Sequence, residues 1–245
     1  MEENEPSVNL KSKKIKDYFL EFAMLFLAVT LGFFAESYRE HLSDKSHERQ
    51  LVRSLVEDLK SDTATIQLSI DFRAKKWKMI DSLMVLLESK QIKGNEGELY
   101  YFGRRLVRNF TFQSNERTLS QLDNSGAAGT IQNVKAMNGI IAYRKLVEII
   151  NKNQDDERLE RQNAFPVLSR MFSPFEFNRM MTPTGVYRSM GNPALRTYDE
   201  ALQQDLAFWA HQIKGSAYLI EGRLGLLKKQ AKELIVLLEM EYELN

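Results

Sequence analysis

The sequence has no cysteine, and its 245 residues include only three histidines and five prolines. Zinc and iron sites are built from clustered Cys, His and carboxylate side chains. His41 and His47 are six residues apart, on different faces of a helix, and His211 stands alone. We therefore expect no metal and no cofactor. The lack of cysteine is compatible with an oxidising compartment but does not require one.

The sequence also lacks an excess of charge of either sign and a recognisable catalytic motif. Lys plus Arg number 34 and Asp plus Glu number 33, so there is no basic field and we expect no nucleic-acid partner. There is no Gly-x-Ser-x-Gly nucleophile motif, and the glycine-rich segment 124–130 lacks the lysine of a phosphate loop. That segment predicts a turn between helices. The chain is predicted not to be an enzyme, although a site assembled only in three dimensions stays an alternative.

Glycine and proline are missing over the 61 residues from Phe33 to Lys93, which predicts a long helix. Apolar residues recur there at spacings of three and four, as in a coiled coil. Asp62, Ser69 and Arg73 interrupt this apolar seam, so a regular coiled coil is not expected. Residues 61–63 are of types that cap helices, and they predict a break or kink.

One long apolar run dominates the N-terminal part: residues 18–35 contain a single charge, Glu21. A helix needs about 20 mostly apolar residues to cross a bilayer, and residues 18–38 satisfy that length. Tyr18 and Tyr38 would then lie near the two interfaces. The uninterrupted run, residues 22–35, is also short enough for a buried core helix. A cleaved signal peptide is less favoured, because Phe33 and Phe34 make a poor processing site.

The flanks of this run bear on orientation. Residues 1–17 form a polar head in which four lysines lie close to the run, and four Lys or Arg residues follow the run within eighteen positions. The counts tie under the positive-inside rule. Because the head lysines are tightly packed, and long downstream domains are translocated largely regardless of charge, we expect a cytoplasmic N-terminus and a periplasmic C-terminal domain. A head of this length is too short for an output domain, so a ligand-sensing receptor would act through a partner.

One face of the predicted membrane helix is a candidate packing surface. Its positions fall within about 40° of one line along the helix: Glu21, Leu25, Ala28, Gly32 and Ala35. The Ala28-x-x-x-Gly32 pair lets two helix backbones approach closely. This face predicts a homo-oligomer or contact with another membrane protein, the alternative being that Glu21 reaches the headgroups and the small residues are incidental.

The remainder predicts an all-α architecture: a stalk over residues 39–50 and a bundle of long antiparallel helices over residues 51–245. We expect helices over about 134–171 and 198–244, with residues 155–158 on the solvent side. Four of the five prolines fall between residues 166 and 193, so segment 172–197 is expected to be irregular.

The irregular segment is a candidate partner surface, because aromatic, Met and Arg residues are enriched at interfaces. The residues concerned are Phe175, Phe177, Arg179, Met180, Met181, Tyr187 and Arg188. The alternative is a lid whose Phe and Met side chains close one end of the bundle.

Two blocks of the chain resemble a known family. The first runs from Tyr18-Phe-Leu-Glu-Phe to Gly32-Phe-Phe-Ala-Glu36 and on to Ser54-Leu-Val-Glu-Asp-Leu-Lys-Ser-Asp-Thr63. The second includes Thr118-Leu-Ser-Gln-Leu-Asp-Asn-Ser-Gly126 and Ile141-Ala-Tyr143. Together they resemble a family of uncharacterised single-pass membrane proteins of Gram-negative bacteria. The resemblance covers roughly residues 18–63 and 114–150, and it implies an inner-membrane setting without implying catalytic residues.

These observations together predict a membrane-anchored, non-enzymatic interaction module that acts as a scaffold or as the sensing subunit of a membrane complex. The expected partners are the lipid bilayer and either a second copy of the chain or another membrane protein.

Overall fold

The computed structural model describes residues 15–124 and 131–244. About 80% of these residues are helical and strand is almost absent, which confirms the all-α expectation. The first part of the polar head and most of the glycine-rich segment 124–130 lie outside the described residues. The chain divides into two compact units, residues 1–50 and residues 51–245. We call the second the helical unit.

The first helix, α1, extends from Ile15 to Glu88 without interruption. The predicted break at residues 61–63 is therefore wrong. Asp62 does not cap a new helix, because its carboxylate accepts hydrogen bonds from the Asn115 backbone N–H at 2.7 Å and from the Tyr143 hydroxyl at 2.6 Å. A residue type that favours helix caps is thus retained in mid-helix by partners distant in sequence.

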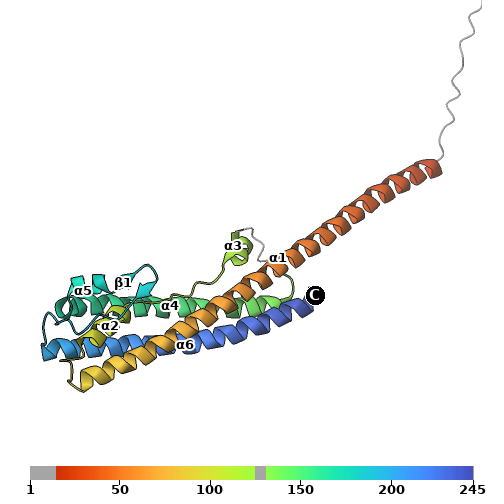
Figure 1. The fold of residues 1–245 in the computed structure, drawn as a ribbon. Coiled ribbons are helices and arrows are strands. Elements are labelled where there is room, and N and C mark those ends of the chain that lie inside the picture. Colours follow the sequence, from red (N-terminus) through yellow and green to blue (C-terminus); the bar gives the residue numbers. More distant parts are fainter. Residues whose placement is uncertain (1–14, 125–130, 245) are drawn as a thin grey trace, which may run out of the picture. The chain divides into compact units, whose positions relative to one another are not determined.

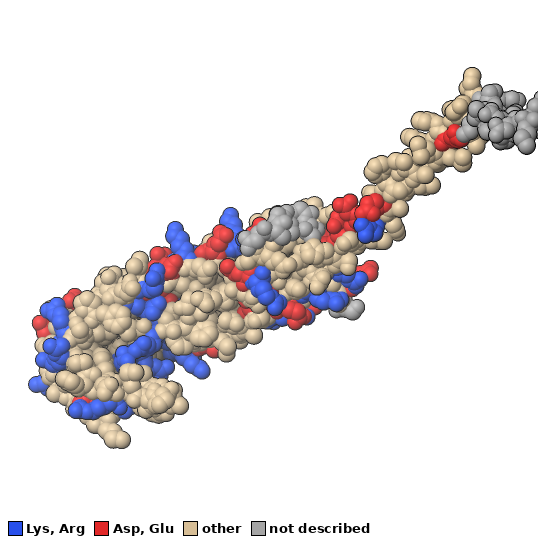
Figure 2. Space-filling model, turned by 90° about the horizontal axis from the view of Figure 1, so that it is seen from above, with Lys and Arg blue, Asp and Glu red and all other residues tan. Residues whose placement is uncertain are grey.

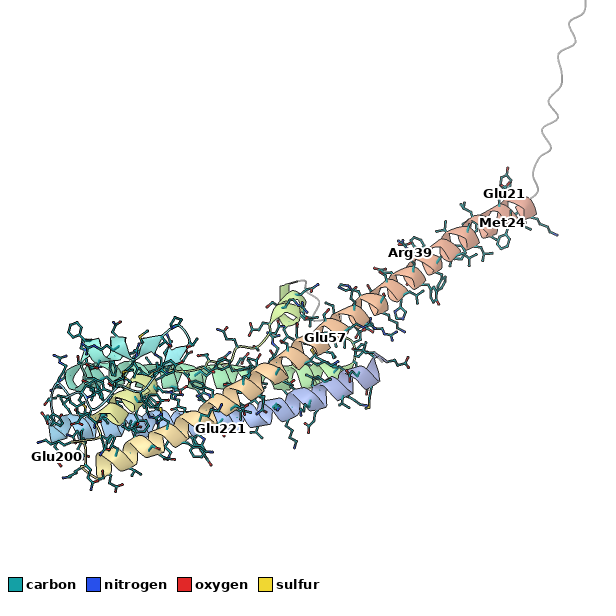
Figure 3. The ribbon with its side chains drawn as sticks, viewed as in Figure 1. Glu21, Met24, Arg39, Glu57, Glu200 and Glu221 are labelled. Atoms are coloured by element: carbon teal, nitrogen blue, oxygen red, sulfur yellow. The ribbon has the colours of Figure 1, made fainter. Side chains whose placement is uncertain are left out.

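The apolar part of α1 is exposed along its whole length. One 18-residue window has a mean hydropathy of 1.9, and none of it is buried. This helix is long and apolar enough to cross a membrane. In Figure 2 the described N-terminal part of α1 shows almost no charged atoms, whereas the surface of the helical unit carries both signs. Glu21 and Met24 project outward from the helix (Figure 3).

Three long helical segments form the helical unit: the part of α1 from residue 51, α4 (Val134–Met171) and α6 (Glu200–Glu241). They lie side by side in Figure 1. Asn133 caps α4 by accepting hydrogen bonds from the backbone N–H groups of Lys135 and Ala136, and Asp199 caps α6 in the same way. The bounds of α4 are those that the sequence predicts.

The core consists of two apolar clusters, one toward each end of the helical unit. The first contains residues 51–66 of α1, 136–150 of α4 and 220–238 of α6, and the second contains residues 80–87, 164–171 and 202–213 of the same helices. α1 and α4 therefore run in the same direction and α6 runs opposite to both. The expected antiparallel packing applies to α6 against its neighbours, since the segment between α1 and α4 returns the chain to the first cluster.

Shorter elements cover the three long helices. α2 (Glu96–Leu106) packs into the second cluster, and α3 (Arg117–Asn124) adds Leu119 and Leu122 to the first. The segment predicted to be irregular contains a short helix, α5 (Pro174–Arg179), and two antiparallel strands, β1 (Met181–Thr182) and β2 (Gly185–Val186).

Candidate functional site

A buried layer of polar residues separates the two apolar clusters. Arg73 and Lys76 of α1 meet Glu157 of α4 in this layer. Arg73 Nη1 donates to Glu157 Oε2 at 3.0 Å, and Lys76 Nζ lies 3.4 Å from Glu157 Oε1. Arg73 and Glu157 are fully buried, and Lys76 is 5% exposed. We call these three residues the charged layer.

The charged layer also holds the connector between α2 and α3. Asn109 donates its amide to Glu157 Oε2 at 2.8 Å, and Lys76 Nζ donates to the carbonyl of Arg108 at 2.9 Å. Gln154, one turn before Glu157, accepts from the backbone N–H of Phe112 and donates to its carbonyl. A segment with little regular structure therefore satisfies its backbone through side chains of α1 and α4.

The charged layer is not balanced. Two cations share one carboxylate, and the Nε and Nη2 atoms of Arg73 are buried without a hydrogen-bond partner among the described residues. Burial raises the pKa of Glu157, but the adjacent Lys76 and Arg73 outweigh this effect, so the pKa lies below its ordinary value. Burial lowers the pKa of Lys76 to about 8, opposed mainly by Glu157.

Glu157 corrects the expectation that residues 155–158 lie on the solvent side. Asp155 and Arg158 are exposed and pair with each other, whereas Glu157 is fully buried between cations. The local sequence alternates in charge as a solvated helix face does, and the cations that bury Glu157 are 84 and 81 residues away. The signal available in the sequence was the interruption of the apolar seam at Arg73.

A cavity opens beside the charged layer. It has a volume of about 350 Å³, and its lining comes from α1, α2 with the residues that follow it, and β2. The lining residues are Phe72, Lys75, Lys76, Met79, Arg105, Arg108, Gly185 and Val186. Four of them are cations, and no carboxylate is among the described residues that line it. We call it the basic cavity.

A second polar centre lies in the first cluster. Asp58 accepts hydrogen bonds from both the N–H and the hydroxyl of Thr118, at 3.0 and 2.6 Å, and from Asn115 at 2.9 Å. Burial raises the pKa of Asp62, against hydrogen bonds from Tyr143 and Asn115. Both carboxylates connect the start of α3 to α1, so their role is to stabilise the fold.

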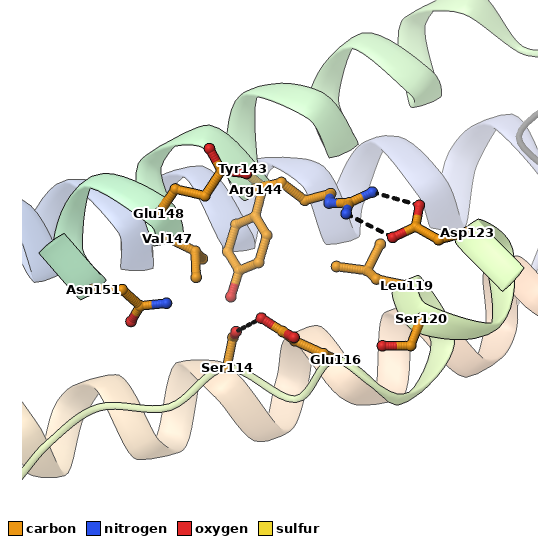
Figure 4. A pocket seen from close by; sticks show the side chains of 10 residues that line it. All are labelled: Ser114, Glu116, Leu119, Ser120, Asp123, Tyr143, Arg144, Val147, Glu148 and Asn151. Carbon is orange, nitrogen blue, oxygen red and sulfur yellow. Dashed lines mark hydrogen bonds and ion pairs between the residues drawn. The ribbon is translucent and has the colours of Figure 1, made fainter.

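A small cavity of about 80 Å³ lies next to this centre, and Figure 4 shows the side chains that line it. Arg144 forms a two-bond ion pair with Asp123 at 2.9 and 2.7 Å across one side of it. Tyr143, which lines the cavity, has its hydroxyl on Asp62. Its polar groups are largely engaged with one another, and its volume suits a few water molecules.

All five residues of the predicted membrane packing face lie on α1 and are exposed: Glu21, Leu25, Ala28, Gly32 and Ala35. A Cβ atom built on Gly32 meets nothing within 4 Å. The small residues therefore leave open surface along this part of the helix.

The candidate partner residues of segment 172–197 separate into two groups. Met180 is 2% exposed and belongs to the second apolar cluster, which Phe177 also contacts. For these two residues the lid interpretation describes the position, since Phe177 packs against Tyr100 with ring centroids 5.7 Å apart.

The other residues of this group face outward. Phe175, Met181 and Tyr187 are exposed, Arg179 pairs with Glu176, and Arg188 pairs with Glu98 while its guanidinium lies 4.4 Å from the centroid of the Tyr101 ring. Beside them is an open cavity of about 930 Å³, lined in part by Met180, Tyr187 and Arg188.

In the part of the chain that the structure describes, no three His, Asp or Glu side chains converge as metal ligands do. Comparison of the chain with protein-family models, with curated proteins and with solved structures found no match.

Proposed function

We propose that the protein is a single-pass membrane protein whose helical unit is a non-enzymatic interaction module of a membrane complex. The observation that carries the proposal is the exposed apolar part of α1. Phe22, Leu25 and Phe33 are each about two-thirds or more exposed, and such residues occur around the whole circumference. Contiguous apolar surface of this extent marks contact with a membrane or a partner, and lipid covers all sides of a helix at once.

The proposed setting is a bacterial inner membrane, with the N-terminus cytoplasmic and the helical unit periplasmic. In this arrangement residues 18–38 span the bilayer, residues 39–50 form a stalk, and residues 51–245 form a bundle. The tyrosines at positions 18 and 38 support the span, because amphipathic rings prefer the membrane interfaces.

Extraction of membranes at high pH tests the anchor. The full chain is expected to remain with the membrane pellet, and Val29→Arg, which places a charge near the middle of the span, is expected to reduce the pelleted fraction, since such a charge opposes insertion by about 2.5–3.5 kcal/mol. Leu42→Arg is the control, because Leu42 is half exposed and lies beyond the apolar run. A full chain that is released into the supernatant would contradict the proposed anchor.

Reporter fusions test the orientation. A phosphatase fused after Asn245 is expected to be active, because this enzyme requires the periplasm. An inactive phosphatase together with a fluorescent cytoplasmic reporter at the same position would reverse the assignment.

Association through the packing face is the proposed route to a homo-oligomer or to another membrane protein. Gly32→Leu is expected to weaken crosslinking in native membranes, because it fills the surface where a second backbone would approach. Leu27→Ala, on the opposite face, is the control. Crosslinked species that are unchanged in Gly32→Leu would exclude this face, and co-purification from native membranes would then identify partners of the bundle.

A sensing role is a second candidate, and the basic cavity favours it. An enzymatic site assembled from distant residues has less support, since the buried carboxylates of the helical unit are engaged with cations, amides or hydroxyls. If a variant loses a bound partner and the turnover of small molecules does not change, the scaffold is favoured over the enzyme.

A further inference from the structure

We propose that the basic cavity binds a small organic oxyanion, a phosphate or carboxylate group carried on an apolar body. The proposal concerns the helical unit only and does not depend on the proposed membrane anchor.

Positive charge converges on the basic cavity from three segments of the chain. Lys75 and Lys76 come from α1, Arg105 from the end of α2, and Arg108 from the connector that follows. Four cations at one cavity repel one another unless an anion is present. Lys76 is paired with Glu157 behind the cavity, but no carboxylate among the described residues lines the cavity itself. Surface lysines and arginines are ordinarily interspersed with acids, and Figure 2 shows both signs of charge on one face of the helical unit.

Lys76 is buried at the basic cavity. A lysine normally extends its ammonium group into water, but this one is 5% exposed and belongs both to the charged layer and to the lining of the cavity. An ammonium group has three protons to donate. Two acceptors are present, the Arg108 carbonyl at 2.9 Å and Glu157 Oε1 at 3.4 Å, and the second contact is long. An oxyanion in the cavity would supply a strong acceptor to this cation.

Arg73, which does not line the cavity, has unsatisfied donors in the charged layer. Its Nη2 and Nε atoms are fully buried without a partner, while Nη1 is bonded to Glu157 Oε2. If an oxyanion replaces Glu157 Oε1 as the acceptor for Lys76 Nζ, Glu157 Oε1 becomes available to accept from Arg73 Nη2. This hydrogen bond would complete a two-bond guanidinium–carboxylate pair. Anion binding would thus relieve a buried charge imbalance that the protein alone leaves in place.

Size and wall chemistry define the ligand class. A volume of about 350 Å³ falls at the lower end of the range of small-molecule sites. Phe72, Met79 and Val186 provide apolar walls next to the cations. Inorganic phosphate would satisfy the cations and leave these walls in water, so an aryl or short alkyl ester fits the cavity better.

Calorimetric titration of the full chain in an uncharged detergent tests the proposal, with three probes: inorganic phosphate, phenyl phosphate and phenol. We expect saturable binding of phenyl phosphate, weaker binding of inorganic phosphate, and none of phenol. Binding of phenol alone would show that the site is merely apolar and would overturn the proposal, as would the absence of saturable binding of either phosphate.

Two variants and one control locate the site. Arg108 is exposed, so Arg108→Gln is not expected to affect folding, and Lys76→Met replaces the buried ammonium group by an uncharged, unbranched side chain that is one atom shorter. Each is expected to weaken phenyl phosphate binding by about tenfold to a hundredfold, the effect of a charge-assisted hydrogen bond. Lys152→Met, exposed on α4 and not lining the cavity, changes net charge equally and should alter binding less than twofold. Equal losses in all three variants would mean generic counterion attraction and would refute the site.

Discussion

Removal of the single carboxylate of the charged layer is the most informative perturbation of the fold. Glu157→Gln keeps the size of the side chain and the contact with Asn109, but it leaves Arg73 and Lys76 buried without an anion. Breaking one partner of a buried ion pair typically costs about 3–5 kcal/mol. For a unit of roughly 200 residues this corresponds to a loss of about 6–20 °C in the unfolding midpoint.

Urea unfolding of the full chain in detergent, followed by tryptophan fluorescence, measures this loss. Both tryptophans, Trp77 and Trp209, lie in the helical unit, so the signal reports on that unit. Asp155→Asn is a matched control on the same helix, because Asp155 pairs with Arg158 at 3.1 Å on the exposed surface and its loss should cost at most about 1 kcal/mol.

A triple variant separates charge imbalance from loss of packing. Glu157→Leu combined with Arg73→Met and Lys76→Met replaces the whole charged layer by apolar groups, and it should recover most of the stability lost in Glu157→Gln. If Glu157→Gln is no less stable than Asp155→Asn, or if the triple variant is less stable than Glu157→Gln, the reasoning about buried charge is refuted.

Three further predictions concern the same unit. Lys76→Met should remove a rise in the free energy of unfolding between pH 8 and 10.5, a rise of at most about 3 kcal/mol. Burial lowers the pKa of Lys76 from 10.5 to about 8 in the folded state, and Arg161 and Arg73 lower it further against the effect of Glu157. The unfolded chain therefore binds more protons than the folded chain in that pH window. Unfolding curves of the native chain and of Lys76→Met at pH 8 and 10 measure this rise. The same rise of stability with pH in the variant would contradict the prediction. Tyr143→Phe should cost about 1–3 kcal/mol in the same assay, because it removes the 2.6 Å hydrogen bond to the buried Asp62, and an unchanged midpoint would show that water replaces the hydroxyl. Gly103→Ala should lower the stability by about 1–3 kcal/mol, since a Cβ atom would lie 2.8 Å from the Phe172 ring. Gly215→Ala, where a Cβ atom would meet nothing within 4 Å, should raise the stability by about 0.5–1 kcal/mol. A stability change of the same sign in both variants would contradict the packing prediction.

Local sequence predicted the helices far better than it predicted the polar core. The lack of Gly and Pro after Gly32 and the apolar spacing of three and four predicted α1 and α4, because helix formation depends on residues close in sequence. The predicted break at residues 61–63 was wrong for the converse reason. Asp62 is a cap-forming residue by type, and the partners that its carboxylate has in mid-helix, Asn115 and Tyr143, are distant in sequence.

The candidate sites show the same division. Position on a helix was predictable for Glu21 and Gly32, whereas whether those residues meet a partner stays a prediction. The burial of Glu157 and the assembly of the basic cavity were not predictable from local sequence. Glu157 lies on α4 and its cations lie on α1, and the cavity lining comes from α1, from α2 with the residues that follow it, and from β2. The lid interpretation of segment 172–197 suits Phe177 and Met180 but not the exposed Phe175.

The charged layer also fixes the alignment of α1 along α4. A slide of one heptad, about 10 Å, keeps the same face of a helix toward its neighbour, so helix periodicity alone specifies the register weakly. The same slide would carry Arg73 into an apolar cluster and leave Glu157 facing aliphatic side chains. A lengthwise displacement of α1 along α4 therefore breaks the buried ion pair before it reaches the next favourable packing. Because the native chain has no cysteine, engineered pairs joining one position of α1 to either of two positions of α4 a heptad apart would measure this register directly.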